Sequence, residues 1–123
     1  MTAISINKHI YNILSNDSTI KEYVGNKIFP MIAEESTTFP FIIYRKNNIQ
    51  TEYTKDGRVF DNTDISITVI ANDYITTVNV AERIRELIEW NKEFADARMI
   101  SNTDEYIDNA YVQELTFSIK IRN

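Results

Sequence analysis

The acidic side chains are the residues of this sequence that could most readily do chemistry, because other reactive types are scarce. The chain has no cysteine and a single histidine, so thiolate catalysis and Ser-His or Cys-His pairs lack a necessary member. Two acidic clusters stand out, at predicted loops or turns: Asp104, Glu105 and Asp108, and Asp61 with Asp64. Such clusters can bind a cation, but neither has the ligand spacing and glycine of an EF-hand. We therefore interpret both as solvated loop acids.

The remaining routes to catalysis also lack their residues. Gly25 and Gly57 are the only glycines and stand alone, whereas a P-loop or a dinucleotide-binding turn needs several close together. His9 lies beside an apolar stripe, where a partly exposed helical residue is the ordinary interpretation. The sequence therefore predicts a protein without catalytic residues, metal or cofactor, and not an enzyme.

Length and composition predict one ordinary globular domain, residues 1–123. The apolar fraction is 43% and the charged fraction 25%, as in typical globular proteins. Eighteen acidic residues outnumber thirteen basic ones, for a net charge of -5, which argues against specific nucleic-acid binding. No apolar run reaches the roughly 20 residues of a membrane span, and Met1–Ser5 shows no export signal. We expect a protein made in a cytoplasm, without a membrane partner.

Two helical regions flank the centre of the chain. In the first 24 residues Ile6, Ile10, Ile13 and Leu14 form one apolar stripe with a period of 3.6 residues. The segment 16–18 interrupts this stripe before a short second helical piece. The second region runs from Tyr74 to about Glu89, with an apolar stripe on one side and charged residues on the other. Asp73 precedes it as an N-cap.

The centre of the chain predicts extended structure. Lys27–Met31 is a short edge segment, and Phe39–Lys46 is a strand rich in β-branched and aromatic residues. The mostly polar segment Asn47–Arg58 contains an Asp-Gly turn signal, and we interpret it as a long hairpin whose tip projects from the body. The returning strand runs from about Val59 to Ala71.

The C-terminal part completes the fold prediction. Residues 97–102 predict a strand, and the acidic segment 103–109 predicts a loop. From Tyr111 to Arg122 the residues follow a period of two, with strict alternation of polar and apolar types from Glu114 onward, as in a strand with one buried and one solvated face. We therefore predict an α+β fold: a mainly antiparallel sheet, two helices packed on one face, and a long projecting hairpin.

The tip of the predicted hairpin is the candidate interaction site. Tyr53 and Phe60 flank its polar turn, where burial inside one small domain is difficult. Aromatic residues and arginine are enriched at protein–protein contacts, which favours a partner surface. Packing of the two aromatic rings across the hairpin ladder is an equally good interpretation. The candidate interface residues are Glu52, Tyr53, Lys55, Asp56, Arg58 and Phe60.

Short motifs follow one another in a distinctive order over almost the full chain. They are Lys27-Ile28-Phe29-Pro30, Pro40-Phe41-Ile42-Ile43-Tyr44, Thr54-Lys55-Asp56-Gly57, Asp73-Tyr74, Ala81-Glu82-Arg83-Ile84-Arg85, and an acidic loop leading to an alternating last strand that ends at Ile121. In this order the chain resembles the tail-completion, or tail-terminator, proteins of long-tailed bacteriophages.

The resemblance implies a structural role in the virion. It implies a homo-oligomeric ring, usually of six subunits, that caps the tail tube at its head-proximal end and contacts the tail tube protein and the head connector protein. Two other classes remain open from the residues alone. One is a head–tail adaptor or minor capsid protein, and the other is a bacterial interaction module unrelated to phages.

Overall fold

The computed structural model describes residues 2–123. Within them the chain forms five strands, three α-helices and one 3-10 turn. In chain order these are η1 (Ala3–Ser5), α1 (Ile6–Ser15), α2 (Ser18–Val24), β1 (Ile28–Pro30), β2 (Phe41–Thr54), β3 (Gly57–Ala71), α3 (Tyr74–Ile88), β4 (Asp96–Ile107) and β5 (Ala110–Arg122).

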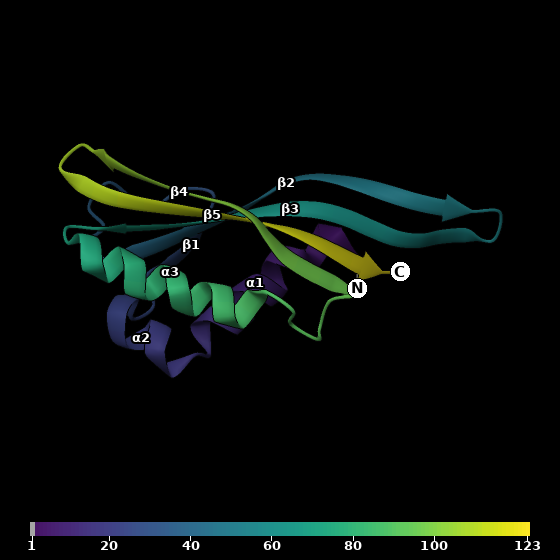
Figure 1. Ribbon diagram of the computed structural model, residues 1–123, viewed down its shortest axis with the longest axis horizontal. Helices are drawn as coiled ribbons and strands as arrows, with labels where there is room; N and C mark the ends of the chain where they lie inside the picture. Colours follow the sequence, from purple (N-terminus) through teal and green to yellow (C-terminus); the bar gives the residue numbers. More distant parts are fainter. Residues whose placement is uncertain (1) are drawn as a thin grey trace.

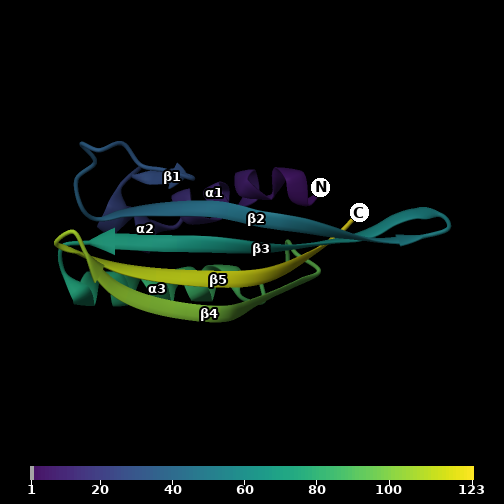
Figure 2. The same ribbon diagram turned by 90° about the horizontal axis from the view of Figure 1, so that it is seen from above.

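The strands form a single mixed sheet in the order β1-β2-β3-β5-β4, seen from above in Figure 2. The short β1 pairs with β2 in parallel, while the other three pairings are antiparallel. The predicted α+β class and the mostly antiparallel sheet are therefore confirmed. The parallel pairing of β1 with β2 was not predicted. It arises because the connection of residues 31–40 leads from the end of β1 back to the start of β2.

The helices lie together below the sheet in Figure 1. The structure has three α-helices in residues 2–123, because the first predicted helical region consists of α1 and the short second piece α2, whereas the fold prediction counted two helices. The reason is local: the Asp17 carboxylate accepts a hydrogen bond from the Ile20 backbone N–H at 3.1 Å and starts α2 as a separate helix. None of the described helices has the length and apolarity needed to cross a membrane.

The core lies between the sheet and these helices. Along β5, the side chains of Leu115, Phe117, Ile119 and Ile121 are buried, and the residues between them are more exposed. Buried residues of β2 and β3 extend the same face, and the helices cover it with apolar side chains. We call the opposite side of the sheet, which no helix covers in Figure 1, the open face.

Strand β4 corrects the predicted loop over residues 103–109. Residues 103–107 continue the strand and pair with β5 up to Ile107 opposite Ala110. Only Asp108 and Asn109 form the turn, with φ of 50° and 63°. Positive φ at both central residues is typical of the tight type I′ hairpin turn, so pairing with β5 extends the strand through its acidic residues.

Strands β2 and β3 extend well past the helices and end in a free tip (Figure 1). Their pairing runs from Phe41 opposite Ile70 to Thr54 opposite Gly57. Strand β2 is longer than the predicted strand, because the polar residues after Lys46 are also paired. Two register shifts, between Lys46 and Ile49 and between Glu52 and Tyr53, interrupt the ladder, and such bulges increase the local twist of a strand.

Candidate interaction surfaces

The hairpin tip is a tight turn held by its own side chain. The Thr54 hydroxyl oxygen accepts from the Asp56 N–H at 3.3 Å and donates to the Gly57 carbonyl oxygen at 3.5 Å. Gly57 has a φ of 122°, a conformation that side chains with a Cβ rarely adopt. Residues 52–58 are all exposed, so the tip presents its side chains to solvent.

The two aromatic residues near the tip have different environments. Cα pairing places Tyr53 opposite Arg58 and Phe60 opposite Glu52, so the ladder does not bring the rings of Tyr53 and Phe60 together. The side chain of Tyr53 is 71% exposed. Phe60 is half-buried, because the cationic groups of Lys120 and Arg122 lie 4.5 and 4.7 Å from its ring centroid.

The candidate interface residues therefore separate into two groups. Glu52 belongs with Phe60, since it accepts from Asn62 Nδ2 at 2.8 Å and lies 3.3 Å from Lys120 Nζ. The hydrogen bond from Asn62, followed by that from Lys120, lowers the pKa of the Glu52 carboxyl. The second group is the tip set, Tyr53, Lys55, Asp56 and Arg58, which makes no ion pair within residues 2–123.

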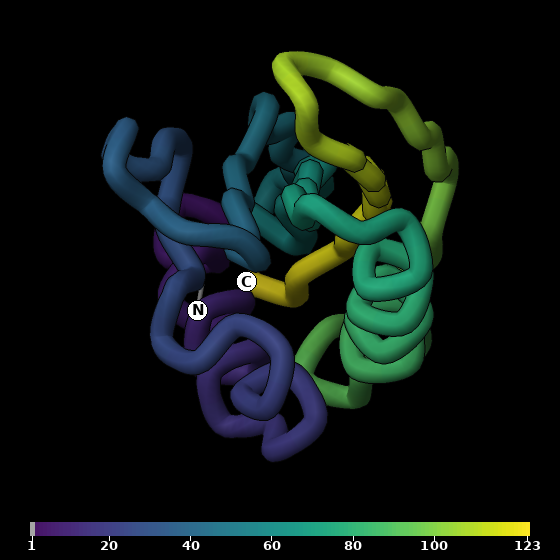
Figure 3. The backbone as a smooth tube through the Cα atoms, turned by 90° about the vertical axis from the view of Figure 1, so that its left-hand side faces the viewer, coloured from purple at the N-terminus to yellow at the C-terminus, as the bar shows by residue number. Residues whose placement is uncertain are grey.

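A second surface, which the sequence reasoning missed, lies on the open face at the other end of the sheet. Phe41, Ile70 and Val112 pair across three neighbouring strands and form an apolar row there. Residues 32–39 and the β4–β5 turn enclose this row in a groove of about 480 Å³. Figure 3 looks onto this end and shows both segments beside the sheet.

The groove has an apolar floor, and the charged residues of its lining are acidic. Phe39 stacks on Phe41 with ring centroids 5.9 Å apart, and Ile32 is 78% exposed. The charged residues lining the groove are Glu34, Glu35 and Asp108, and no basic residue of the described chain lines it. The sequence carried a signal, since apolar residues occupy successive positions from Phe41 to Tyr44. Such a run places apolar groups on both faces of a strand.

Asp61 stabilises the fold from a buried position, whereas the sequence predicted a solvated turn acid. It lies within β3 and is buried. Its carboxylate accepts from the Ala3 N–H at 3.0 Å, from the Thr51 hydroxyl at 2.7 Å and from Asn123 Nδ2 at 3.2 Å. The hydrogen bond from Ala3 is the main cause that lowers the pKa of Asp61. Asp64, three residues further along the strand, lies on the open face, so the two acids do not form a site.

The acids near the β4–β5 turn also remain apart. Asp104 accepts a hydrogen bond from the Tyr74 hydroxyl at 2.7 Å, and this bond raises the pKa of the Tyr74 hydroxyl. Glu105 is the next residue of the strand and points to the opposite face, while Asp108 lies in the turn. Among residues 2–123, no group of three or more His, Asp or Glu side chains is arranged to hold a metal ion.

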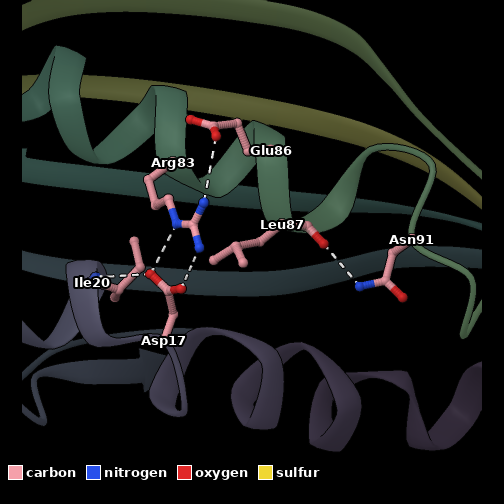
Figure 4. Close-up of polar contacts among 6 residues, drawn as sticks. All are labelled: Asp17, Ile20, Arg83, Glu86, Leu87 and Asn91. Carbon is pink, nitrogen blue, oxygen red and sulfur yellow. Dashed lines mark hydrogen bonds and ion pairs between the residues drawn. The ribbon is translucent and has the colours of Figure 1, made fainter.

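Two polar contacts between separate elements join parts of the fold rather than forming a catalytic centre. Asp17 accepts from Arg83 Nη2 at 2.6 Å and from Arg83 Nε at 3.1 Å (Figure 4). This bidentate contact joins α2 to α3, and it is the main cause that lowers the pKa of Asp17. The single histidine, His9 on α1, lies with Nδ1 3.3 Å from Glu93 Oε1. Both contacts hold elements together.

Comparison with known proteins decides the family. Residues 8–122 match the family described as tail completion protein gp17. This chain belongs to that family. The tail completion protein is thus a structural protein of phage tail assembly, as the order of sequence motifs predicted.

The fold of this tail completion protein also occurs in a solved virion. A chain of the virion of a native gene transfer agent particle superposes with a TM-score of 0.79 at 13% sequence identity. The match covers 93% of this chain and 92% of that chain. At this identity the likeness concerns the fold. No protein with a curated function matches this sequence.

Proposed function

We propose that this tail completion protein forms a ring of six subunits that caps the tail tube at the head-proximal end of the phage tail. The whole chain, residues 1–123, acts as one domain with helices packed on one face of the sheet. Its partners are further copies of itself, the tail tube protein and the head connector protein. The protein is made in the cytoplasm of the host bacterium and acts without enzymatic activity.

The observation that carries the proposal is family membership together with the two unlike surfaces of the chain. A ring needs a heterologous interface, in which one patch of each subunit binds a different patch of the next. The projecting hairpin and the apolar groove supply two such patches on one subunit. The hairpin residues Glu52, Tyr53, Lys55, Asp56, Arg58 and Phe60 are the proposed interface, with the exposed tip set making the contact.

The test combines a mass measurement with an assembly assay. Light scattering over a range of protein and salt concentrations gives the oligomeric state, for which we expect a closed ring of about six subunits. In parallel, the protein is added to extracts that contain tails but lack it, and completed tails are counted by electron microscopy. Binding to the portal side of heads instead of to tail ends would contradict the proposal and identify a head–tail adaptor.

A charge exchange at the tip tests the hairpin directly. The double substitution Asp56→Lys with Arg58→Glu should leave the fold intact, because both side chains are exposed, and should reduce tail completion. The matched control is Lys8→Glu with Glu22→Lys, which also preserves net charge at exposed helical positions. Normal tails from the tip variant would remove the hairpin from the interface.

A further inference from the structure

The groove on the open face has the chemistry of a receptor for a specific kind of side chain. Its floor is the row of Phe41, Ile70 and Val112 with Phe39 beside it. Its charged lining is acidic, from Glu34, Glu35 and Asp108. Binding there buries apolar surface and brings positive charge toward the carboxylates. The matching ligand is a large apolar or aromatic side chain with cationic neighbours.

The hairpin tip of the same chain carries that combination. Tyr53 is a largely exposed aromatic side chain, and rigid aromatic side chains are typical anchors of protein interfaces. Lys55 and Arg58 lie within five residues of it and make no ion pair within residues 2–123. Glu52 is engaged with Asn62 and Lys120, which leaves Asp56 as the one acid of the tip set.

The tip and the groove of one chain cannot meet each other. The β2–β3 turn lies at one end of the long axis in Figure 1, and the β4–β5 turn, which borders the groove, lies at the other. A contact between them therefore needs two copies. It either is exchanged reciprocally within a pair or continues from copy to copy until a ring closes.

We propose that the groove of one copy binds the hairpin tip of a second copy. Tyr53 enters between residues 32–39 and the β4–β5 turn, and Lys55 with Arg58 faces the acidic residues of the groove. The proposal rests on the proposed ring, because it names the two surfaces that the ring interface joins.

Disulfide trapping tests the contact. The chain has no cysteine, so only the introduced cysteines can form disulfides. One variant carries Asp56→Cys at the tip, and another carries Thr37→Cys in the groove. Under mild oxidation we expect covalent dimers when the two variants are mixed and few when either is oxidised alone. The control replaces the tip variant with Lys92→Cys, an exposed position between α3 and β4.

The mass of each unoxidised variant separates failure of this contact from failure of the ring. Oligomers that give no more tip–groove disulfide than the Lys92→Cys control overturn the contact and leave the ring standing. Trapped dimers support the contact, and if the mass of the unoxidised protein never exceeds that of a dimer, the ring is overturned. A monomer without specific disulfides overturns the contact, and the tail extract assay then decides the ring.

Charge reversal tests which residues meet. Two double variants reverse the charges, Lys55→Glu with Arg58→Glu at the tip and Glu34→Lys with Glu35→Lys in the groove. Each should raise the protein concentration at which half of the protein is associated about tenfold, because exposed ion pairs are replaced by like charges. A mixture of the two reversed variants should associate nearly as the original protein does. Failure of the mixture to recover would overturn the pairing of these charges.

Discussion

Individual residues divide into those with local partners and those with distant ones. Asp17 and Asp73 each accept a hydrogen bond from the backbone N–H three residues later, which is the usual N-cap pattern and is readable from sequence. Asp61 receives hydrogen bonds from residues 58 and 62 positions away. No local pattern encodes such partners, so an aspartate that joins both ends of the chain was interpreted as a solvated turn acid.

The role of Asp61 predicts a clear difference between two aspartates of β3. Asp61→Ala should lower the free energy of unfolding by about 2–3 kcal/mol, because buried donors lose a charged acceptor. Asp64→Ala, a change on the open face of the same strand, should cost less than about 0.5 kcal/mol. Urea unfolding measures both. Equal effects would show that the hydrogen bonds to Asp61 do not stabilise the fold.

Whole elements were predictable where the residue pattern and the tertiary context agree. Alternation along residues 111–122 predicted β5, and the apolar stripe of residues 74–89 predicted α3. Strand β4 was predicted too short, because Asp104 and Glu105 are poor strand formers and only the neighbouring β5 holds them extended. Asp108-Asn109 is a tight turn signal in its own right, since both residues tolerate positive φ. The groove combines β2, β3 and β5 with residues 32–39, so the apolar run from Phe41 to Tyr44 indicated a second apolar face but not the groove itself.

In the hairpin, Gly57 should affect the local opening of the tip and have little effect on the stability of the core strands. Gly57→Val forces a Cβ onto a backbone with φ of 122°, while nothing lies within 4 Å of the added atom, so the strain is in the backbone alone. We expect faster amide exchange in residues 52–60 with little change in the core strands, because tips open locally. Lys55→Ala is the control, and slowed or unchanged exchange in Gly57→Val would contradict the expectation.

The molecule as a whole depends on carboxylates that bridge its elements. Asp17 joins α2 to α3, Asp61 joins the chain ends to the sheet, and Glu89 accepts from Arg85 on α3 and from the Met99 N–H on β4. The pKa of each is lowered: in Asp17 and Glu89 mainly by the arginine hydrogen bond, and in Asp61 by that from Ala3. The order of motifs indicated the family, and the helical and strand patterns predicted the fold class, but these bridges required the structure.

Lowered pKa values predict loss of stability in acid. The contribution of each carboxylate is fully present above its unfolded pKa, near about 4, and is lost as the pH falls through the lower folded pKa. The free energy of unfolding in urea should therefore drop from pH 5 to pH 2. The double variant Asp17→Asn with Asp61→Asn should have a lower free energy of unfolding at pH 7. Its free energy of unfolding should also decrease less between pH 5 and pH 2. An unchanged slope would assign the acid sensitivity to other groups.

The hairpin tip and the apolar groove lie at opposite ends of the long axis, and this gives every copy a direction. A ring generated by rotation alone has no two-fold axis that exchanges its sides, so its two rims differ in chemistry. One rim cannot substitute for the other on a tube or a connector. The proposed ring would therefore bind a tube or a connector in one orientation only, and the tail end that it covers would present a different surface from the bare tube.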